Sequence, residues 1–448
     1  MNHILKEKLM KRKTIFIGLM VGLLVVGLLV PKVSLAQEKA EVSFWHAMGW
    51  MDAYIKRMAE DFSFYYPATK LTSLQKGSYT ETLTAVMAAA GVGDAPHVFQ
   101  TSEIGTKQAY DSGYITPFAD LVKVGEVDWT DFLQPLLDNA TIGGKLVSIP
   151  WNNSSPILYY NKNIFKKAGL NPDNAPTTWE DVSSACRKIV ASGAAQYGIV
   201  WPLHQWWYVE WMTEQGQDIV NNENGRAGTP TESYLLSEAS VRTFEFWKQL
   251  YDEKLYVNPG VEAWTESNQI FWAQKAGMAM ESTAAVRRFL AGGLEGGYEV
   301  GVSVLPTPRG IKRHGIMLGG GTLFITKGHP EEETEAAKEF LKWISLPEQT
   351  IRWHKATGYY PSRHSAVNVL ELTGWFKQYP GYRVAFDQLL ESEPGTKGPL
   401  MGNYREVTTL IVNALEKVFA GKLTVKEALT EAKQKVDKVL AEYARIVG

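Results

Sequence analysis

The spacing of apolar positions changes repeatedly along the chain, between the alternation typical of strands and the longer period typical of helices. In the first hundred residues the pattern predicts strands at 40–46, 70–74 and 95–100 and helices over 51–62 and 80–90. Strands that alternate with helices favour an α/β lobe with a mostly parallel sheet, whose site lies on the loops after the strands. Tyr79 and Glu103 fall on such loops, where a solvated side chain is the alternative role.

A polar stretch in the middle of the chain has the pattern of a connection between two lobes. Pro150 and Pro156 keep their surroundings extended, because proline fixes its own φ and disfavours helix in the residue before it. Small polar residues at 152–155 lie between them, and an apolar strand is predicted at 157–160. This arrangement suits a linker that crosses between lobes and presents donors to a ligand. An ordinary loop with an edge strand is the alternative.

Four tryptophans then follow within a short segment: Trp201, Trp206, Trp207 and Trp211. Trp207 and Trp211 share one face of a helix and are typical of a core, whereas one or both of Trp201 and Trp206 are expected at a ligand. Polar residues at 204–205 make the segment too polar for a wholly buried helix. An indole offers a flat apolar face that can stack on a sugar ring.

The pattern of the second half continues to alternate. It predicts strands at 277–282, 298–305 and 322–326 and helices over 178–192, 241–250, 332–344, 407–419 and 425–443. Three glycines at 319–321 precede the last of these strands. They either let backbone N–H groups approach another group closely or form a bulge.

The first 36 residues have the features of an export signal. A basic front is followed by an unbroken apolar run at 15–30, and small residues at 34–36 offer a cleavage site, so the mature chain is expected to begin at Gln37. An uncleaved membrane anchor is the alternative. The run is shorter than the ~20 residues that a membrane span needs, and Pro31 follows it at once.

Composition narrows the class of protein. Without the signal, 412 residues remain, more than the ~250 to 300 at which a single core stops growing, so at least two domains are expected. The formal net charge of −2 argues against nucleic acid as a partner. Cys186 is the only cysteine, which excludes a disulfide framework and a lipidated first residue, and its apolar surroundings predict a small buried side chain.

Seven segments together carry a resemblance to a known family. They are FWHAM at 44–48, KGSY at 76–79, GDAPHVFQTSEIGT at 93–106, SSPILYYNKNIFKKAGLNP at 154–172, MLGGGT at 317–322, WHKATGYYP at 353–361 and TKGPLMGN at 396–403. Over residues 42–443 the chain resembles the family 1 extracellular solute-binding proteins of carbohydrate-type ABC importers. Within that family it is most similar to the periplasmic receptors for glycerol 3-phosphate and glycerophosphodiesters.

This resemblance implies a two-lobed α/β periplasmic-binding-protein fold of type II, like that of maltose-binding protein, with the ligand in the interlobe cleft. It implies a first lobe of residues 37–152 plus 283–345 and a second lobe of residues 153–282 plus 346–448. It further implies an exported, periplasmic monomer that delivers a small molecule to ABC permease subunits in the membrane. Neither a cofactor nor a metal is expected.

The resemblance also implies the ligand contacts Tyr79, Glu103, Ser154, Trp206, Ser282, Gly320 and Tyr359, and a second tryptophan near Trp201. In such a set Glu103 accepts from hydroxyl groups and Trp206 covers a carbon face. The family's phosphate-side arginine aligns with Thr408, and the nearest arginine is Arg405, almost one helical turn earlier. Either Arg405 reaches the phosphate, or the ligand carries none.

Two other functions remain open at this point. A receptor of the same class could take a neutral disaccharide, oligosaccharide or polyol. A secreted glycosidase would use paired carboxylates beside aromatic residues. Signatures of other enzymes are absent from the sequence: it contains no HExxH, no phosphate-cradling GxxxxGK[ST], and at 301–305 no closing glycine of a nucleophile elbow.

Overall fold

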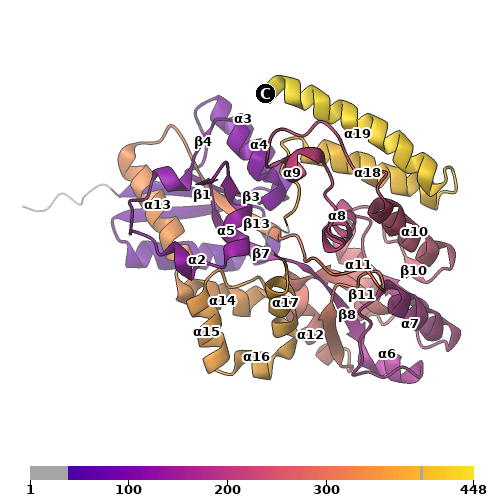
Figure 1. Cartoon of the computed structure of the whole chain (residues 1–448). Coiled ribbons are helices and arrows are strands. Elements are labelled where there is room, and N and C mark those ends of the chain that lie inside the picture. Colours follow the sequence, from indigo (N-terminus) through magenta and orange to yellow (C-terminus); the bar gives the residue numbers. More distant parts are fainter. Residues whose placement is uncertain (1–38, 394–396, 448) are drawn as a thin grey trace, which may run out of the picture.

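The computed structural model describes residues 39–393 and 397–447. The predicted export signal at 1–36 and the predicted first residue Gln37 lie outside this part of the chain. Among the described residues, no helix has both the length and the apolar character needed to cross a membrane. The strands form a six-stranded sheet, a five-stranded sheet and a two-stranded ribbon, and helices cover both large sheets (Figure 1).

The six-stranded sheet has the order β2-β1-β3-β13-β4, with β7 also paired to β13. Its strands are β1 (Ala40–His46), β2 (Thr69–Gln75), β3 (Val98–Ser102), β4 (Ile115–Thr116), β7 (Ile149–Ser154) and β13 (Gly319–Thr326). β1 runs parallel to β2 and β3, whereas β13 runs antiparallel to its three neighbours. The strands predicted at 40–46, 70–74 and 322–326 are confirmed. The one predicted at 95–100 begins only at Val98, since Pro96 has no N–H for a ladder.

Four helices pack on this sheet: α2 (Asp52–Tyr65), α3 (Tyr79–Gly91), α4 (Thr106–Asp111) and α13 (Glu331–Ile344). Phe62 on α2 and Phe340 on α13 meet in the core, with ring centroids 5.3 Å apart. Helix α3 begins with a capping box, in which Ser78 and Glu81 each satisfy a backbone N–H of the other. This cap makes Tyr79 the first residue of the helix, at the carboxyl end of the sheet.

The five-stranded sheet has the order β10-β9-β11-β8-β12. Its strands are β8 (Pro156–Asn161), β9 (Tyr197–Val200), β10 (Tyr256–Val257), β11 (Ala276–Ser282) and β12 (Val300–Val304). The sequence-based division assigned residues 283–345 to the first lobe, and this is wrong for β12. The strand pairs antiparallel with β8 from Val300 to Val304, because the chain stays with the second sheet until it returns through β13.

Eight helices belong to the second lobe, which is built around this sheet. They are α6 (Lys162–Lys167), α7 (Trp179–Ala191), α8 (Gln205–Glu214), α10 (Glu238–Asp252), α11 (Trp264–Trp272), α12 (Val286–Glu295), α18 (Tyr404–Phe419) and α19 (Val425–Val447). Trp211 packs edge-on against Trp201 and Trp247 in the core, with ring centroids 5.8 and 5.7 Å away. Cys186 is buried, as predicted. Helices α18 and α19 lie side by side along one edge of the molecule (Figure 1).

A single residue connects the two sheets at their first crossing. β7 ends at Ser154 and β8 begins at Pro156, so only Ser155 lies between them. Every residue of both strands is buried. Ser155 is held by Thr283, whose N–H donates to the Ser155 carbonyl at 2.8 Å. The predicted crossing at 152–155 is therefore confirmed.

Helices α14 (Pro347–Thr357), α15 (His364–Leu372), α16 (Trp375–Gln378) and α17 (Pro380–Leu390) form a group on the side away from α18 and α19 (Figure 1). Trp353 on α14 contacts Tyr54 on α2, with ring centroids 5.5 Å apart. α17 packs on β12. The group thus touches both lobes.

The remaining elements are short. They are α5 (Gln134–Asn139), α9 (Asn221–Gly225), β5 (Thr141–Ile142), β6 (Lys145–Leu146), η1 (Gly49–Met51), η2 (Glu103–Gly105), η3 (Phe118–Asp120), η4 (Trp129–Asp131) and η5 (Thr283–Ala285).

Candidate functional site

The three glycines at the start of β13 lie against the crossing strand β7. Gly319 pairs with Ser154 and Gly320 with Asn153, and a bulge follows Gly321. Gly320 has a φ of +97°, and a Cβ added there would lie 1.9 Å from the carbonyl oxygen of Asn152. Only glycine fits that position, so both expectations for this segment, close approach and a bulge, are met. What the glycines approach is the backbone of the crossing strand.

Beside them, Tyr79 and Tyr359 form a hydroxyl cluster with Asn152 and Met48. The Asn152 amide donates to the Tyr79 hydroxyl at 2.6 Å, and both tyrosine hydroxyls lie within 3.9 Å of the Met48 sulfur. Gln100 fixes the Asn152 side chain by donating to its oxygen at 2.8 Å. Burial raises the pKa of each tyrosine, so both hydroxyls are neutral and can donate. The structure thus brings two predicted contacts together.

Glu103 follows β3 directly and opens the short helix η2. Its side chain is buried, and Oε2 has no hydrogen-bond partner among the described residues. Burial raises the pKa of this carboxyl to about 8, with no lysine or arginine acting against the shift. The next residue, Ile104, packs against the core of the second lobe. Glu103 therefore projects from the first lobe at the contact between the lobes.

Helix α8 brings Trp206 and Glu210 to the same contact from the second lobe. The four-residue spacing places both on one helix face. The Glu210 Oε2 accepts from the Met317 N–H at 2.9 Å. Its Oε1 and the Trp206 Nε1 have no well-formed hydrogen bond with the described residues, although Trp206 lies near enough to oppose the rise in the pKa of the Glu210 carboxyl. A Cβ added at Gly319 would lie 2.8 Å from the Trp206 ring, so this glycine leaves room for the indole.

The environment of α8 changes along the helix. Every residue from Trp206 to Glu214 is buried, whereas His204 and Gln205, the polar residues of the predicted segment, are only half-buried, so the segment is not wholly buried. His204 caps the helix by accepting from the Trp206 N–H at 3.1 Å. Burial lowers the pKa of His204 to about 4, which keeps Nδ1 free of a second proton and able to accept. Burial also raises the pKa of Glu210 well above its usual range, and the nearby carboxyls of Glu214 and Glu103 add to the shift.

Tyr404, the first residue of α18, completes the group. It is buried, and its hydroxyl has no partner among the described residues. Burial raises its pKa well above the usual value, and the charges of Glu103 and Glu210 raise it further, which shows that the three groups lie near one another. No cation contributes to the pKa of any of them. At this point the contact between the lobes is therefore formed by acids and neutral donors.

We call this group the interlobe site. It consists of Glu103, Asn153, Trp206, Glu210 and Tyr404, each of which has a buried polar atom without a partner among the described residues. Buried polar atoms in native proteins are nearly always hydrogen-bonded, to protein, water or ligand. Five such atoms, supplied by both lobes and the strand that joins them, are suited to the hydroxyl groups of a small polar molecule.

Other predicted ligand residues have different surroundings. Ser154 is buried on β7 next to Gly319. The Ser282 hydroxyl accepts from the Ala284 N–H at 3.1 Å and so caps η5. Trp201 is wholly buried against Trp211 and Tyr256, so in this structure it offers no face to a ligand. Its Nε1 has no hydrogen-bond partner among the described residues, so the role expected for Trp201 stays a prediction, with the core as the alternative.

The two residues predicted for a phosphate also differ from each other. Thr408 is buried, and its hydroxyl donates to the Tyr404 carbonyl of its own helix at 3.0 Å. Arg405 is exposed, and its guanidinium has no hydrogen bond or ion pair with the residues that the structure describes. The pKa of Glu81 is lowered mainly by hydrogen bonds with Ser78, and the positive charge of Arg405 lowers it further. Arg405 of α18 therefore faces the first turn of α3.

Sequence reasoning missed Glu210 and Tyr404. A glutamate within a helix usually faces solvent, and only its four-residue spacing from Trp206 could have indicated otherwise. Tyr404 directly precedes Arg405, but a helix turns about 100° per residue, so neighbours face different sides. Asn153 was predicted only as part of the polar crossing at 152–155.

Known proteins resemble this chain over most of its length. The family described as bacterial extracellular solute-binding protein matches residues 54–384. The sn-glycerol-3-phosphate-binding periplasmic protein UgpB of Yersinia pseudotuberculosis is 29% identical over 422 residues, covering 91% of this chain and 94% of its own. UgpB of Escherichia coli is 28% identical over 426 residues, covering 92% and 94%.

Solved structures share the fold. UgpB of Mycobacterium tuberculosis, in complex with glycerophosphocholine, has a TM-score of 0.75 at 22% identity and covers 90% of this chain and 98% of its own. The GacH receptor of Streptomyces glaucescens, studied with acarbose, has a TM-score of 0.76 at 20% identity and covers 90% and 99%. At these identities the likeness concerns the fold alone. It confirms a two-lobed architecture of the maltose-binding-protein type.

Proposed function

Because this chain belongs to the bacterial extracellular solute-binding proteins and is the substrate-binding receptor of an ABC importer, we propose that its interlobe site binds a glycerophosphodiester. The observation that carries this proposal is the set of five buried polar atoms without described partners, contributed by both lobes. A receptor captures its ligand without converting it. The protein is not an enzyme, and we place it in the periplasm, where the named relatives work.

The glycerol end of the ligand fits the carboxyl groups. Glu103 and Glu210 each have one free carboxyl oxygen. This oxygen accepts a hydrogen bond from a hydroxyl group when the carboxyl is ionised and can donate one when it is protonated. Trp206 offers the carbon skeleton an apolar face beside Gly319. Tyr404 and Asn153 can complete the hydrogen bonds of the remaining hydroxyl groups. A polyol binds here without bringing charge next to two acids.

The phosphate end belongs near Arg405. A phosphate needs a cation or several donors beside it, and no cation acts on Glu103 or Glu210, whereas Arg405 is exposed at the start of α18 and faces α3. Backbone N–H groups at the N-terminus of α18 favour an anion as well. A diester carries a single negative charge and a monoester nearly two, so a buried site without a cation of its own favours the diester. We therefore rank glycerophosphocholine above glycerol 3-phosphate.

A neutral sugar or polyol is the second candidate, and Thr408 favours it. This residue stands where the family's phosphate-side arginine aligns, and its hydroxyl is occupied by its own helix. No cation acts on the interlobe acids. The two candidates differ in one respect only, which is whether Arg405 meets an anion.

Binding is proposed to proceed by hinge closure, with the protein as a monomer that hands its ligand to the permease. Neither lobe alone supplies all five atoms of the interlobe site, so the lobes must meet to surround a ligand. The radius of gyration from solution scattering should therefore decrease at saturating ligand. Identical scattering curves with and without ligand would count against closure.

Calorimetry tests the choice of ligand directly. The exported protein is titrated with glycerophosphocholine, sn-glycerol 3-phosphate and maltose, and each mixture is then checked by chromatography for products. We expect stoichiometric binding without turnover, tightest for glycerophosphocholine. Binding of maltose alone would replace the first candidate by the second. Release of product from any of the three would contradict the receptor function.

A further inference from the structure

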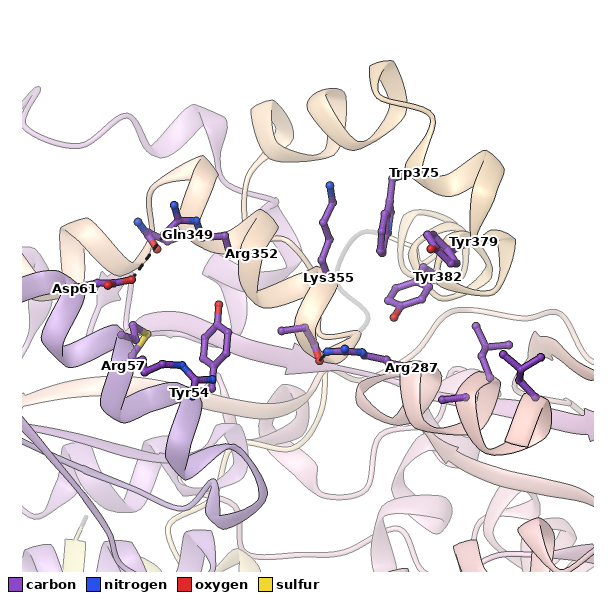
Figure 2. Close-up of a pocket in the computed structure, with 15 residues that line it drawn as sticks. Tyr54, Arg57, Asp61, Arg287, Gln349, Arg352, Lys355, Trp375, Tyr379 and Tyr382 are labelled. Atoms are coloured by element: carbon purple, nitrogen blue, oxygen red, sulfur yellow. Dashed lines mark hydrogen bonds and ion pairs between the residues drawn. The ribbon is translucent and has the colours of Figure 1, made fainter. Parts of the chain in front are cut away.

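A second hollow lies on the side of the molecule away from the interlobe site. It has a volume of about 830 Å³, within the range of about 300 to 1,000 Å³ that is usual for small-molecule sites. We call it the rear pocket. It is enclosed by α2 of the first lobe and by α12, α14, α16 and α17 (Figures 1 and 2). None of the residues predicted to bind the ligand lines it.

Cationic side chains dominate the charge of the rear pocket. Arg57, Arg287, Arg352 and Lys355 line it, together with a single carboxylate, Asp61. In Figure 2, Arg57, Arg352 and Asp61 lie on one side, Lys355 lies toward the aromatic side, and Arg287 lies below, between the two sides. Charges of one sign gathered in a hollow focus the field and attract ions of the opposite sign. The rear pocket therefore favours anions.

These cations are only weakly neutralised by the protein. Arg352 and Asp61 lie 3.9 Å apart and are both more than half exposed, so their attraction is largely screened by water. The Arg287 guanidinium donates to the Ala356 carbonyl at 3.1 Å, which positions the group and leaves its charge uncompensated. Arg57 has no ion pair within the described residues. Several donors thus remain available to an anionic group.

The opposite wall is aromatic. Trp375 contacts Tyr379 and Tyr382, with ring centroids 4.3 and 5.4 Å away, and all three rings line the pocket. Lys355 lies 4.8 Å from the Trp375 ring centroid. The Trp375 Nε1 is buried and has no acceptor in the part of the chain that the structure describes. Such a wall offers flat apolar contact and one free N–H to a bound molecule.

From this geometry we propose that the rear pocket is a second small-molecule site, which binds an organic anion with a flat apolar body. The anionic group meets Arg57, Arg287 and Lys355, and the apolar body lies on Trp375 and its two tyrosine neighbours. No cation acts on the acids of the interlobe site, whereas four cations line the rear pocket, so the two sites differ in chemistry. This proposal is independent of which solute the interlobe site binds.

The probe for a direct test is 8-anilinonaphthalene-1-sulfonate, which joins fused rings to one anionic group and fluoresces when bound in apolar surroundings. We expect one equivalent to bind the folded, full-length mature protein. The double variant Arg57→Gln with Lys355→Gln should bind the probe at least about tenfold more weakly, because two cations are lost. The control Lys377→Gln removes an exposed cation on α16 that does not line the pocket, and it should bind like wild type.

Two further measurements make the proposal falsifiable. N-phenyl-1-naphthylamine has the same rings without the sulfonate, and it should bind at least about tenfold more weakly than the sulfonate. Trp206→Ala should leave binding of the sulfonate unchanged, since Trp206 belongs to the interlobe site. Equal affinity for the uncharged probe, loss of binding in Trp206→Ala, equal loss in Lys377→Gln, or no binding to wild type would each overturn the assignment.

Discussion

The interlobe site holds buried acids, whereas the rear pocket holds exposed cations. Glu103 and Glu210 are buried, and no cation acts on either carboxyl. In the rear pocket, Arg57 and Arg352 are exposed, and only Asp61 among the lining residues opposes them. One region thus holds acids that water cannot reach. The other holds cations that water can reach.

This difference decides how each region recognises a ligand. A buried carboxyl loses its hydration, so its pKa rises and its free oxygen demands a hydrogen-bond partner. Recognition there depends on the position of individual hydroxyl groups. An exposed guanidinium keeps its charge and acts at longer range, and its effect falls with salt. Recognition in the rear pocket therefore depends on charge and apolar contact more than on exact hydroxyl geometry.

Glu103→Gln tests the buried member of this comparison and has the largest expected effect. Burial raises the pKa of Glu103 to about 8 from a usual value of 4.5, so between these values the folded state binds more protons than the unfolded chain. The free energy of unfolding of wild type must then fall as the pH rises from about 5 to 8. Glutamine does not titrate. We expect the variant to match wild type at pH 5 and to exceed it by as much as about 5 kcal/mol at pH 9.

Urea unfolding at pH 5, 7 and 9 measures this difference. Burial also raises the pKa of Glu210 and Glu214, so some decline with pH should persist in the variant. The expected signature is a smaller slope, not a flat profile. Parallel profiles for wild type and Glu103→Gln would mean that the carboxyl is solvated in the folded protein, and the contrast with the rear pocket would fail.

The variants Trp201→Ala and Trp206→Ala test which of the two indoles belongs to the core and which to the interlobe site. Trp201 is wholly buried among aromatic rings, and its removal should lower the free energy of unfolding by about 3 to 5 kcal/mol. Trp206 lies beside the free carboxyl oxygens, and its removal should lower stability less and weaken ligand binding by about 1 to 2 kcal/mol. Melting temperature and calorimetric affinity, measured on both variants, separate the two roles. A larger loss of stability in Trp206→Ala would reverse the assignment.

Most elements of the fold could be predicted from periodicity, because each has one face or two in the core. The strand at 40–46 and the helix over 80–90 appear as β1 and α3 within a residue. The boundaries between the two lobes were harder to predict from the sequence than the elements themselves. β12 reads as a strand in the sequence, but its partner β8 is far away in the chain, and no local pattern states which sheet a strand joins.

The interlobe site was only partly predictable. Tyr79 and Glu103 could be found from their place after strands, and the glycines at 319–321 from the conformations that only glycine adopts. Glu210 and Tyr404 became visible only in the structure, since burial of a helical glutamate depends on tertiary packing. The sequence could not assign Trp201 to the core or to the ligand, because an indole suits a core and a sugar equally well.

The variant Arg405→Ala tests whether Arg405 supplies the positive charge that meets the phosphate of a ligand in the interlobe site. If glycerophosphocholine is the ligand, the variant should bind it about 2 kcal/mol more weakly, because a charge-assisted hydrogen bond to the phosphodiester is lost. Affinity for a neutral sugar should not change. Calorimetry of both ligands on both proteins gives the answer, with Lys377→Gln as a control for loss of a distant exposed cation. Unchanged affinity for glycerophosphocholine would remove Arg405 from the site.

Asp61→Asn makes in the rear pocket the same acid-to-amide change that Glu103→Gln makes between the lobes, and here the expected effect on stability is smallest. Asp61 is 56% exposed and lies 3.9 Å from Arg352, which is equally exposed. Such surface pairs contribute about 0 to 1 kcal/mol, so the free energy of unfolding should change by less than about 0.5 kcal/mol.

The same variant should nevertheless strengthen binding of an anion in the rear pocket. Removing the only lining carboxylate raises the local positive potential, and we expect affinity for 8-anilinonaphthalene-1-sulfonate to rise about two- to fivefold at low salt. Because exposed charges are screened, this gain should shrink as salt is raised from about 0.01 to 0.15 M. A gain that persists at high salt would point to a direct steric effect of Asp61. A loss of affinity would mean that Asp61 positions Arg352 for the anion, so that the acid in this pocket supports binding although its charge opposes it.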